Sequence, residues 1–156
     1  MKQFLKIVLG IVILGVIGFG VYSVLPEYPH DFVKSFVQPV VDSQAKERIN
    51  AVKNIFNQDL QSTYGSILES HTKNRFWVYD LNEATAAETV TFYGSGAYIN
   101  VSDIDNHDEM LYTSCQVKFE FVITGNKVEI FAYIDGEVQD DAVKELMIQQ
   151  LLEGNN

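Results

Sequence analysis

An unbroken apolar segment from Ile7 to Leu25 is the strongest constraint on how this chain folds, because none of its nineteen residues is charged. A helix rises about 1.5 Å per residue, so this segment would reach about 28 Å, close to the hydrocarbon thickness of a bilayer. The sequence therefore predicts a single membrane span in contact with lipid through residues 7–25. Everything after it is then a domain held beside that membrane.

The residues that flank this segment indicate whether it is cleaved and how it is oriented in the membrane. Both lysines of the first six residues precede it, as in a secretory signal peptide, but the apolar run is longer than usual and contains no alanine. We expect residues 1–25 to be retained as a signal anchor rather than cleaved. Positive charge stays on the cytoplasmic side, and the acidic Glu27 and Asp31 follow the span. Residues 26–156 are therefore expected outside the cytoplasm, in a periplasmic or extracellular location.

The part of the chain beyond the span is strongly acidic. Residues 26–156 hold all 21 acidic residues but only 9 of the 11 basic ones, a net charge of −12 with histidine neutral. Nucleic acid requires a basic face, so the composition argues against it as a partner. The single cysteine, Cys115, cannot form an internal disulfide, so the fold depends on packing and we expect this thiol to be buried.

A proline-containing stalk is predicted between the span and the domain. Residues 26–42 carry all three prolines of the chain, which favours only a turn or two of helix from Asp31 to Val37. Two phenylalanines and two valines would share one side of that short helix. The sequence leaves open whether this apolar side lies on the bilayer surface or packs on the domain.

The domain proper, residues 43–156, begins with a helical pattern. Apolar residues recur every three or four positions from Ala45 to Ile67, with polar residues between them. Asp42 or Ser43 is a candidate N-cap residue for this helix. We therefore predict one long helix from about Ser43 to Ser70.

Beyond this helix the spacing changes to the alternation of strands. Glycines at 94 and 96 permit a bulge, and Gly125–Asn126 between two alternating runs predicts a hairpin. Asp140 and Asp141 favour the start of a C-terminal helix. The expected fold class is α+β, with one long helix packed on a curved antiparallel sheet of four or five strands and a short C-terminal helix. This layout is similar to that of cystatin-like and NTF2-like domains.

One face of the predicted hairpin is only partly polar. Its second strand places Phe131 and Tyr133 opposite the core side, and the apolar stripe of the C-terminal helix continues to Leu151 and Leu152. Part of this surface should therefore be covered by the C-terminal helix, by a partner or by a ligand. These four side chains are the candidate partner-binding residues.

An acidic loop is the best candidate for metal binding. Five of its side chains could offer ligands to a hard cation such as calcium: Asp103, Asp105, His107, Asp108 and Glu109. The loop departs from the EF-hand pattern, because its sixth position is not glycine and its twelfth is not glutamate. The chain contains no HExxH, CxxC or GxSxG motif, so no catalytic residue and no cofactor are predicted.

Two functions are compatible with these features. In the first, the protein is a non-catalytic accessory subunit, a single-pass anchored module that binds another envelope or membrane protein. In the second, it is an exported ligand-binding or metal-binding domain, or an enzyme, with its site between the long helix and the sheet or in the acidic loop. The first accounts for the retained anchor and for the half-apolar sheet face, so it is the function we expect.

Calcium binding to the acidic loop has a direct test. A ligand that binds only the folded state stabilises it, so millimolar calcium should raise the melting temperature of the protein. Asp105→Asn removes one carboxylate and should abolish the rise. An unchanged melting temperature in millimolar calcium would contradict the calcium site.

Overall fold

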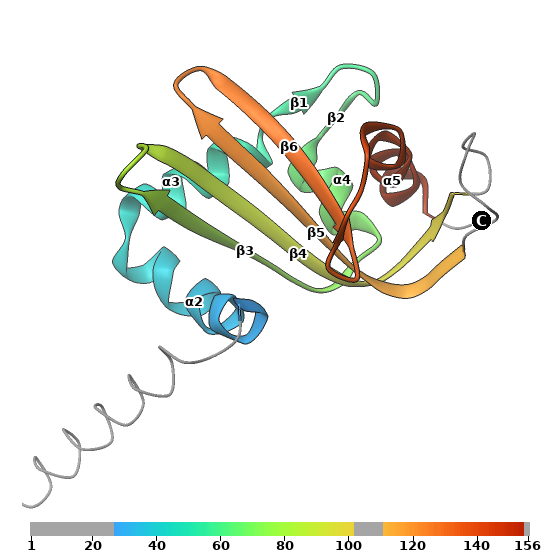
Figure 1. Cartoon of the computed structure of the whole chain (residues 1–156), viewed down its shortest axis with the longest axis horizontal. Helices are drawn as coiled ribbons and strands as arrows, with labels where there is room; N and C mark the ends of the chain where they lie inside the picture. The colour runs from blue at the N-terminus through green and yellow to red at the C-terminus, as the bar shows by residue number, and fades with distance from the viewer. Residues whose placement is uncertain (1–26, 102–110, 155–156) are drawn as a thin grey trace, which may run out of the picture.

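The computed structural model describes residues 27–101 and 111–154 (Figure 1). Its elements in chain order are α2 (Glu27–Val41), α3 (Ser43–Lys53), β1 (Phe56–Asn57), β2 (Ser62–Thr63), α4 (Tyr64–Ser70), β3 (Lys73–Asn82), β4 (Ala87–Asn100), β5 (Leu111–Thr124), β6 (Lys127–Ile134), β7 (Glu137–Val138) and α5 (Asp141–Glu153). The predicted α+β class is therefore confirmed. Within these residues no helix has the length and apolarity needed to cross a membrane, and the predicted span lies outside them.

The main sheet is a five-stranded antiparallel meander in the order β3-β4-β5-β6-β7. The hairpin predicted at Gly125–Asn126 is confirmed, since Thr124 pairs with Lys127 across the turn. Gly125 has φ +61°, a conformation that glycine adopts without strain. The predicted bulge also occurs, as a shift of register between Gly94 and Ala97 within the long strand β4.

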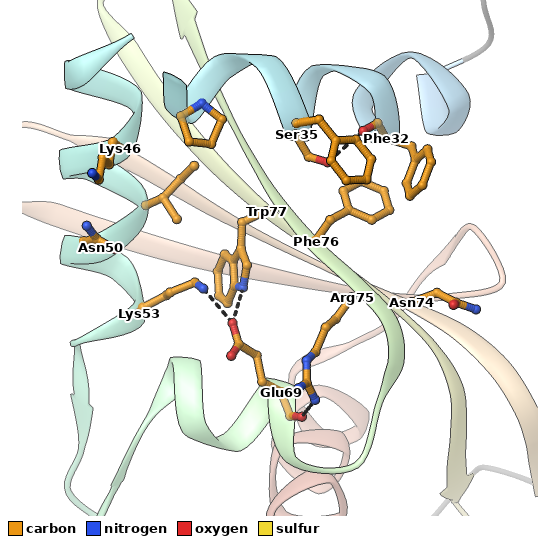
Figure 2. A pocket seen from close by; sticks show the side chains of 13 residues that line it. Phe32, Ser35, Lys46, Asn50, Lys53, Glu69, Asn74, Arg75, Phe76 and Trp77 are labelled. Carbon is orange, nitrogen blue, oxygen red and sulfur yellow. Dashed lines mark hydrogen bonds and ion pairs between the residues drawn. The ribbon is translucent and has the colours of Figure 1, made fainter. Parts of the chain in front are cut away.

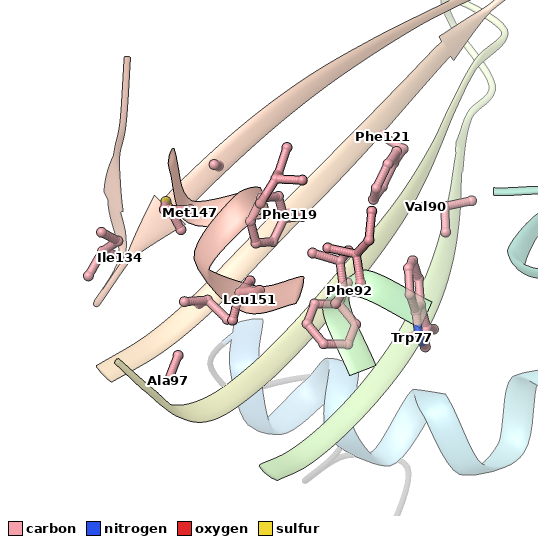
Figure 3. Close-up of a cluster of buried hydrophobic side chains, with 14 of the residues drawn as sticks. Trp77, Val90, Phe92, Ala97, Phe119, Phe121, Ile134, Met147 and Leu151 are labelled. Carbon is pink, nitrogen blue, oxygen red and sulfur yellow. The ribbon is translucent and has the colours of Figure 1, made fainter. Parts of the chain in front are cut away.

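The hydrophobic core lies on one face of this sheet. Alternate side chains of the central strands point into it, and Phe92 and Phe119 are fully buried there. Helices α3, α4 and α5 cover this face, and Figure 3 shows Met147 and Leu151 of α5 close to the phenylalanines. The thiol of Cys115 is buried as predicted, and this burial raises its pKa to about 11.

The single long helix predicted from Ser43 to Ser70 is wrong. Helix α3 ends at Lys53, and the short ribbon of β1 and β2 separates it from α4. The cause is local hydrogen bonding by short polar side chains. The Asn57 side chain accepts from two backbone amides that follow it, and Thr63 accepts from the amide of Ser66 to begin a new helix. The helical spacing is present at both ends, but these side chains interrupt it in the middle.

The predicted stalk forms a longer helix than expected. Helix α2 covers residues 27–41 rather than a turn or two from Asp31 to Val37. Proline at position 29 lies in the first turn, where a missing amide proton costs nothing, and Pro39 lies in the last turn. The helix lies along the edge strand β3, which places it beside the sheet (Figure 1).

Helices α3 and α4 approach each other closely at Gly65. A Cβ atom at this position would lie 2.9 Å from both the carbonyl oxygen and the Cβ atom of Lys53. Alanine usually favours a helix over glycine by about 1 kcal/mol, but here the overlap outweighs that preference. Gly65→Ala should therefore lower the free energy of unfolding by about 1–3 kcal/mol, measured by chemical denaturation.

Ser66→Ala provides the matched control, because Ser66 is the next residue of the same helix and is exposed. It should change the free energy of unfolding by less than about 0.5 kcal/mol. A neutral or stabilising effect of Gly65→Ala would contradict the close approach of the two helices.

Candidate functional site

A groove of about 730 Å³ lies where α2, α3 and α4 meet the edge strand β3 (Figure 2). This volume falls within the range of about 300–1,000 Å³ that is usual for ligand sites. The lining residues are Phe32, Ser35, Phe36, Pro39, Lys46, Ile49, Asn50, Lys53, Glu69, Asn74, Arg75, Phe76 and Trp77. The groove therefore combines apolar walls with charged groups.

Aromatic rings form the wall of the groove on the side of α2. The ring of Phe32 meets Phe36 edge-on at 5.0 Å between centroids and Phe76 at 5.4 Å. On the far side, Phe76 stacks on Tyr93 at 4.8 Å. Edge-on and offset contacts of this kind favour one arrangement of the rings, so this wall is built from interlocked side chains of a helix and two strands.

The opposite wall is organised by Glu69. Its Oε1 atom accepts a hydrogen bond from Trp77 Nε1 at 2.8 Å and lies 2.7 Å from Lys53 Nζ. The ammonium group of Lys53 lies 5.3 Å from the centre of the Trp77 ring, a favourable cation–π distance. The carbonyl group of Glu69 also accepts a hydrogen bond from Arg75. One glutamate thus holds the indole ring and two cations together.

The charge of the groove is opposite to that of the chain. Lys46, Lys53 and Arg75 line it against the single acidic residue Glu69, although the whole chain carries a net charge of −10. Lys46 is exposed, and no ion pair joins it to any residue in the described part of the chain. The rim therefore favours an anionic group on whatever enters the groove.

The edge of strand β3 contributes backbone groups to this region. At Tyr79, the Gln38 side chain donates to the carbonyl oxygen at 2.6 Å and accepts from the amide at 2.9 Å. Outward and inward residues alternate along an antiparallel strand, and the register is continuous from Phe76 to Asn82. The N–H and C=O groups of Trp77 therefore point to the same outward side as those of Tyr79. Gln38 satisfies the outward backbone groups of Tyr79, whereas no hydrogen bond among the described residues engages the outward N–H and C=O groups of Trp77.

The predicted partner-binding residues lie on both sides of the sheet. Phe131 is 40% exposed on the face opposite the core, and beside it the Tyr133 hydroxyl donates to Glu120 Oε2 at 2.7 Å. Leu151 is only 1% exposed in the core, and Leu152 packs against that core. Helix α5 therefore covers the core face and not the face that carries Phe131.

The predicted metal ligands from Asp103 to Glu109 lie outside the described residues. Within residues 27–101 and 111–154, no three histidine, cysteine or acidic side chains are grouped to hold a metal ion. The sequence placed an alternative site between residues 43–70 and the sheet, but it did not predict the wall from α2, because it treated that segment as a stalk and merged α3 with α4. The signal that was available is the polar spacing of Asp31, Lys34 and Gln38 along α2.

Comparison with known protein families, with curated proteins and with solved structures finds no match to this chain. The likeness of its layout to cystatin-like and NTF2-like domains therefore stays a prediction.

Glu69 should make the stability of the protein depend on pH. Partial burial alone would raise the pKa of its carboxyl group, but the hydrogen bonds from Lys53 and Trp77 outweigh burial and hold that pKa below its usual value. Glu69→Gln should therefore lower the free energy of unfolding at pH 7 by about 1 kcal/mol. Because the folded-state pKa is depressed, the difference is present above the unfolded pKa of about 4.3 and is lost as the pH falls through the folded value.

Urea denaturation at pH 7 and at pH 3 measures this difference. Glu83→Gln is the control, because Glu83 is exposed and forms no ion pair within the described residues. The control should have little effect at either pH. A destabilisation by Glu69→Gln that persists unchanged at pH 3 would contradict the role of the carboxylate.

Proposed function

We propose that this protein is a membrane-anchored, non-catalytic binding module outside the cytoplasm, an accessory subunit of an envelope complex. In this proposal its groove binds a short extended segment of a partner protein. The observation that carries the proposal is the backbone of Trp77, which faces outward from the edge strand β3. At the next outward-facing residue, Tyr79, the side chain of Gln38 already satisfies the backbone groups.

A peptide matches the three kinds of group that the groove offers. Its backbone can pair with the N–H and C=O groups of Trp77 and so extend the sheet by one short strand. An apolar side chain of the peptide can enter between the aromatic rings of α2 and β3. An acidic side chain can meet Lys46 or Arg75 on the rim. A hydrocarbon ligand would bury the Trp77 backbone without providing hydrogen bonds, at a cost of about 1–3 kcal/mol per polar group.

The position of Gln38 limits the length of the bound segment. Helix α2 occupies the edge of β3 at Tyr79, so a partner strand cannot continue along the sheet past that residue. The segment therefore pairs near Trp77 and depends on its side chains for much of its affinity. This is the reason why an apolar and acidic composition is expected of the partner.

The membrane attachment is proposed from the apolar residues 7–25 and the two lysines before them. A positively charged N-terminal flank favours a cytoplasmic N-terminus, which places the groove on the other side of the membrane. A partner in the same membrane or envelope would then meet the groove without diffusion through bulk solvent.

Peptide selection tests the binding function. The full chain in phosphatidylcholine nanodiscs would be used to select from a display library of random peptides. The selected sequences should combine apolar residues with at least one aspartate or glutamate, because the groove has aromatic walls and a cationic rim. Lys46→Glu should weaken a selected peptide about tenfold, equivalent to about 1.4 kcal/mol, by isothermal titration calorimetry.

Lys127→Glu makes the same charge change at the exposed end of the β5–β6 hairpin and should leave the affinity unchanged. Two N-methylated forms of the peptide, modified at adjacent positions, test the strand pairing. Only one of them should lose binding, because alternate amides of a paired strand face away from the sheet. Failure to select any peptide, or equal weakening by the two charge variants, would count against the proposal.

A further inference from the structure

Helix α2 contacts the domain through a polar side as well as through the ring of Phe32, which packs on Phe76. Asp31, Lys34 and Gln38 are spaced by three and four residues, so they share one side of the helix. Asp31 is buried and its Oδ2 atom accepts a hydrogen bond from the Tyr93 hydroxyl at 2.8 Å. Lys34 pairs with Asp80, and Gln38 is bonded to the backbone of Tyr79. All three polar residues are therefore used within the domain.

A second side of α2, next to the polar one, is apolar and exposed. We call it the valine face, and it consists of Val33, Val37, Val40 and Val41, which are 40%, 53%, 82% and 75% exposed. A surface helix normally keeps such apolar side chains against the core and its polar side in water. Contiguous exposed apolar surface of this kind usually marks a contact with another molecule or with a membrane.

We propose that the valine face lies on the surface of the lipid bilayer, with α2 parallel to the membrane plane. This inference rests on the membrane anchor of the proposed function. The apolar segment ends at Leu25 and α2 begins at Glu27, so only one residue, a proline, separates them. A helix that begins so close to the end of a span lies at the level of the lipid headgroups. Its apolar side can then enter the boundary between headgroups and acyl chains.

The charges of α2 indicate which kind of lipid surface it meets. The four valines carry no charge, and the one lysine of the described helix, Lys34, is paired with Asp80. The domain as a whole is acidic, so anionic headgroups would repel it. The contact is therefore driven by burial of the valines, and a neutral phosphatidylcholine surface is sufficient.

A second copy of the chain is a weaker explanation of the valine face. A stable interface between proteins usually buries about 1,200 Å² or more, whereas this face spans four valines on one helix of fifteen residues. A bilayer needs no complementary surface of that size. Helix α2 also joins the valine face to the groove, because its residues Phe36 and Pro39 line the groove. The groove would then open beside the membrane surface, where a segment of a membrane protein partner emerges.

A fluorophore on α2 tests this placement. Val40→Cys in the full chain would be labelled with the environment-sensitive dye NBD and reconstituted into phosphatidylcholine vesicles. Val40 is highly exposed, so the change should not disturb the fold, and the buried Cys115 should stay unlabelled at neutral pH. The NBD emission should shift to the blue and should be quenched by lipids that carry a nitroxide near the headgroup. Gln58→Cys, an exposed position on the loop between β1 and β2, is the control that should remain unquenched.

Each outcome decides between the alternatives. An unshifted Val40 probe would place the valine face in water and overturn the inference. A blue shift without lipid quenching would show that protein covers the face, which also overturns it. Extraction with alkaline carbonate reports on the anchor separately, and release of the chain would overturn both the anchor and this inference. Retention in the membrane with an unquenched probe would overturn the inference alone.

Discussion

The two hydrogen bonds between the Gln38 side chain and the backbone of Tyr79 determine how the rest of the molecule is arranged. An edge strand presents backbone groups that must be satisfied, and a primary amide offers the same donor and acceptor as a peptide group. Gln38 satisfies them from a helix 41 residues earlier in the chain. Because this contact uses the polar side of α2, the aromatic residues of the helix are left to form a wall of the groove and the valines are left outward.

The groove is maintained by a second set of polar contacts centred on Glu69. This carboxylate is shared between the indole of Trp77 and the ammonium of Lys53, so a helix, a strand and a second helix are joined at one side chain. The same contacts concentrate positive charge at one place on an acidic protein. A local charge opposite to the net charge matters more for recognition than the net charge itself, because a bound segment senses the groups within a few ångströms of it.

The two proposals describe one arrangement. If the valine face of α2 rests on the bilayer, the groove where α2, α3 and α4 meet β3 is held at a constant orientation beside it. A partner segment that leaves the same membrane would meet the open edge at Trp77 with little loss of orientational freedom, which favours binding even by a short segment. The anchor would thus contribute to recognition as well as to location.

The sequence by itself determined the elements whose signals are local. Gly125–Asn126 specifies a hairpin because glycine accepts positive φ, and Asp140 begins α5 because its side chain accepts from the amide of Val143 at 2.9 Å. The alternation of apolar residues along β5 identified the core face correctly for Val117, Phe119 and Phe121. Between residues 54 and 63 the helical spacing predicted a helix that does not form, because short polar side chains there separate α3 from α4.

Only the tertiary structure decided where these elements lie and what they form together. The side of α2 that faces the sheet is set by Gln38 and Asp31 meeting residues 41 and 62 positions away, and neither partner can be read from the helix itself. The groove depends on the same long-range contacts, since its lining comes from three helices and one strand. Periodicity indicates which residues share a face of a helix or strand. Which other element that face packs against depends on the free energy of the whole folded domain.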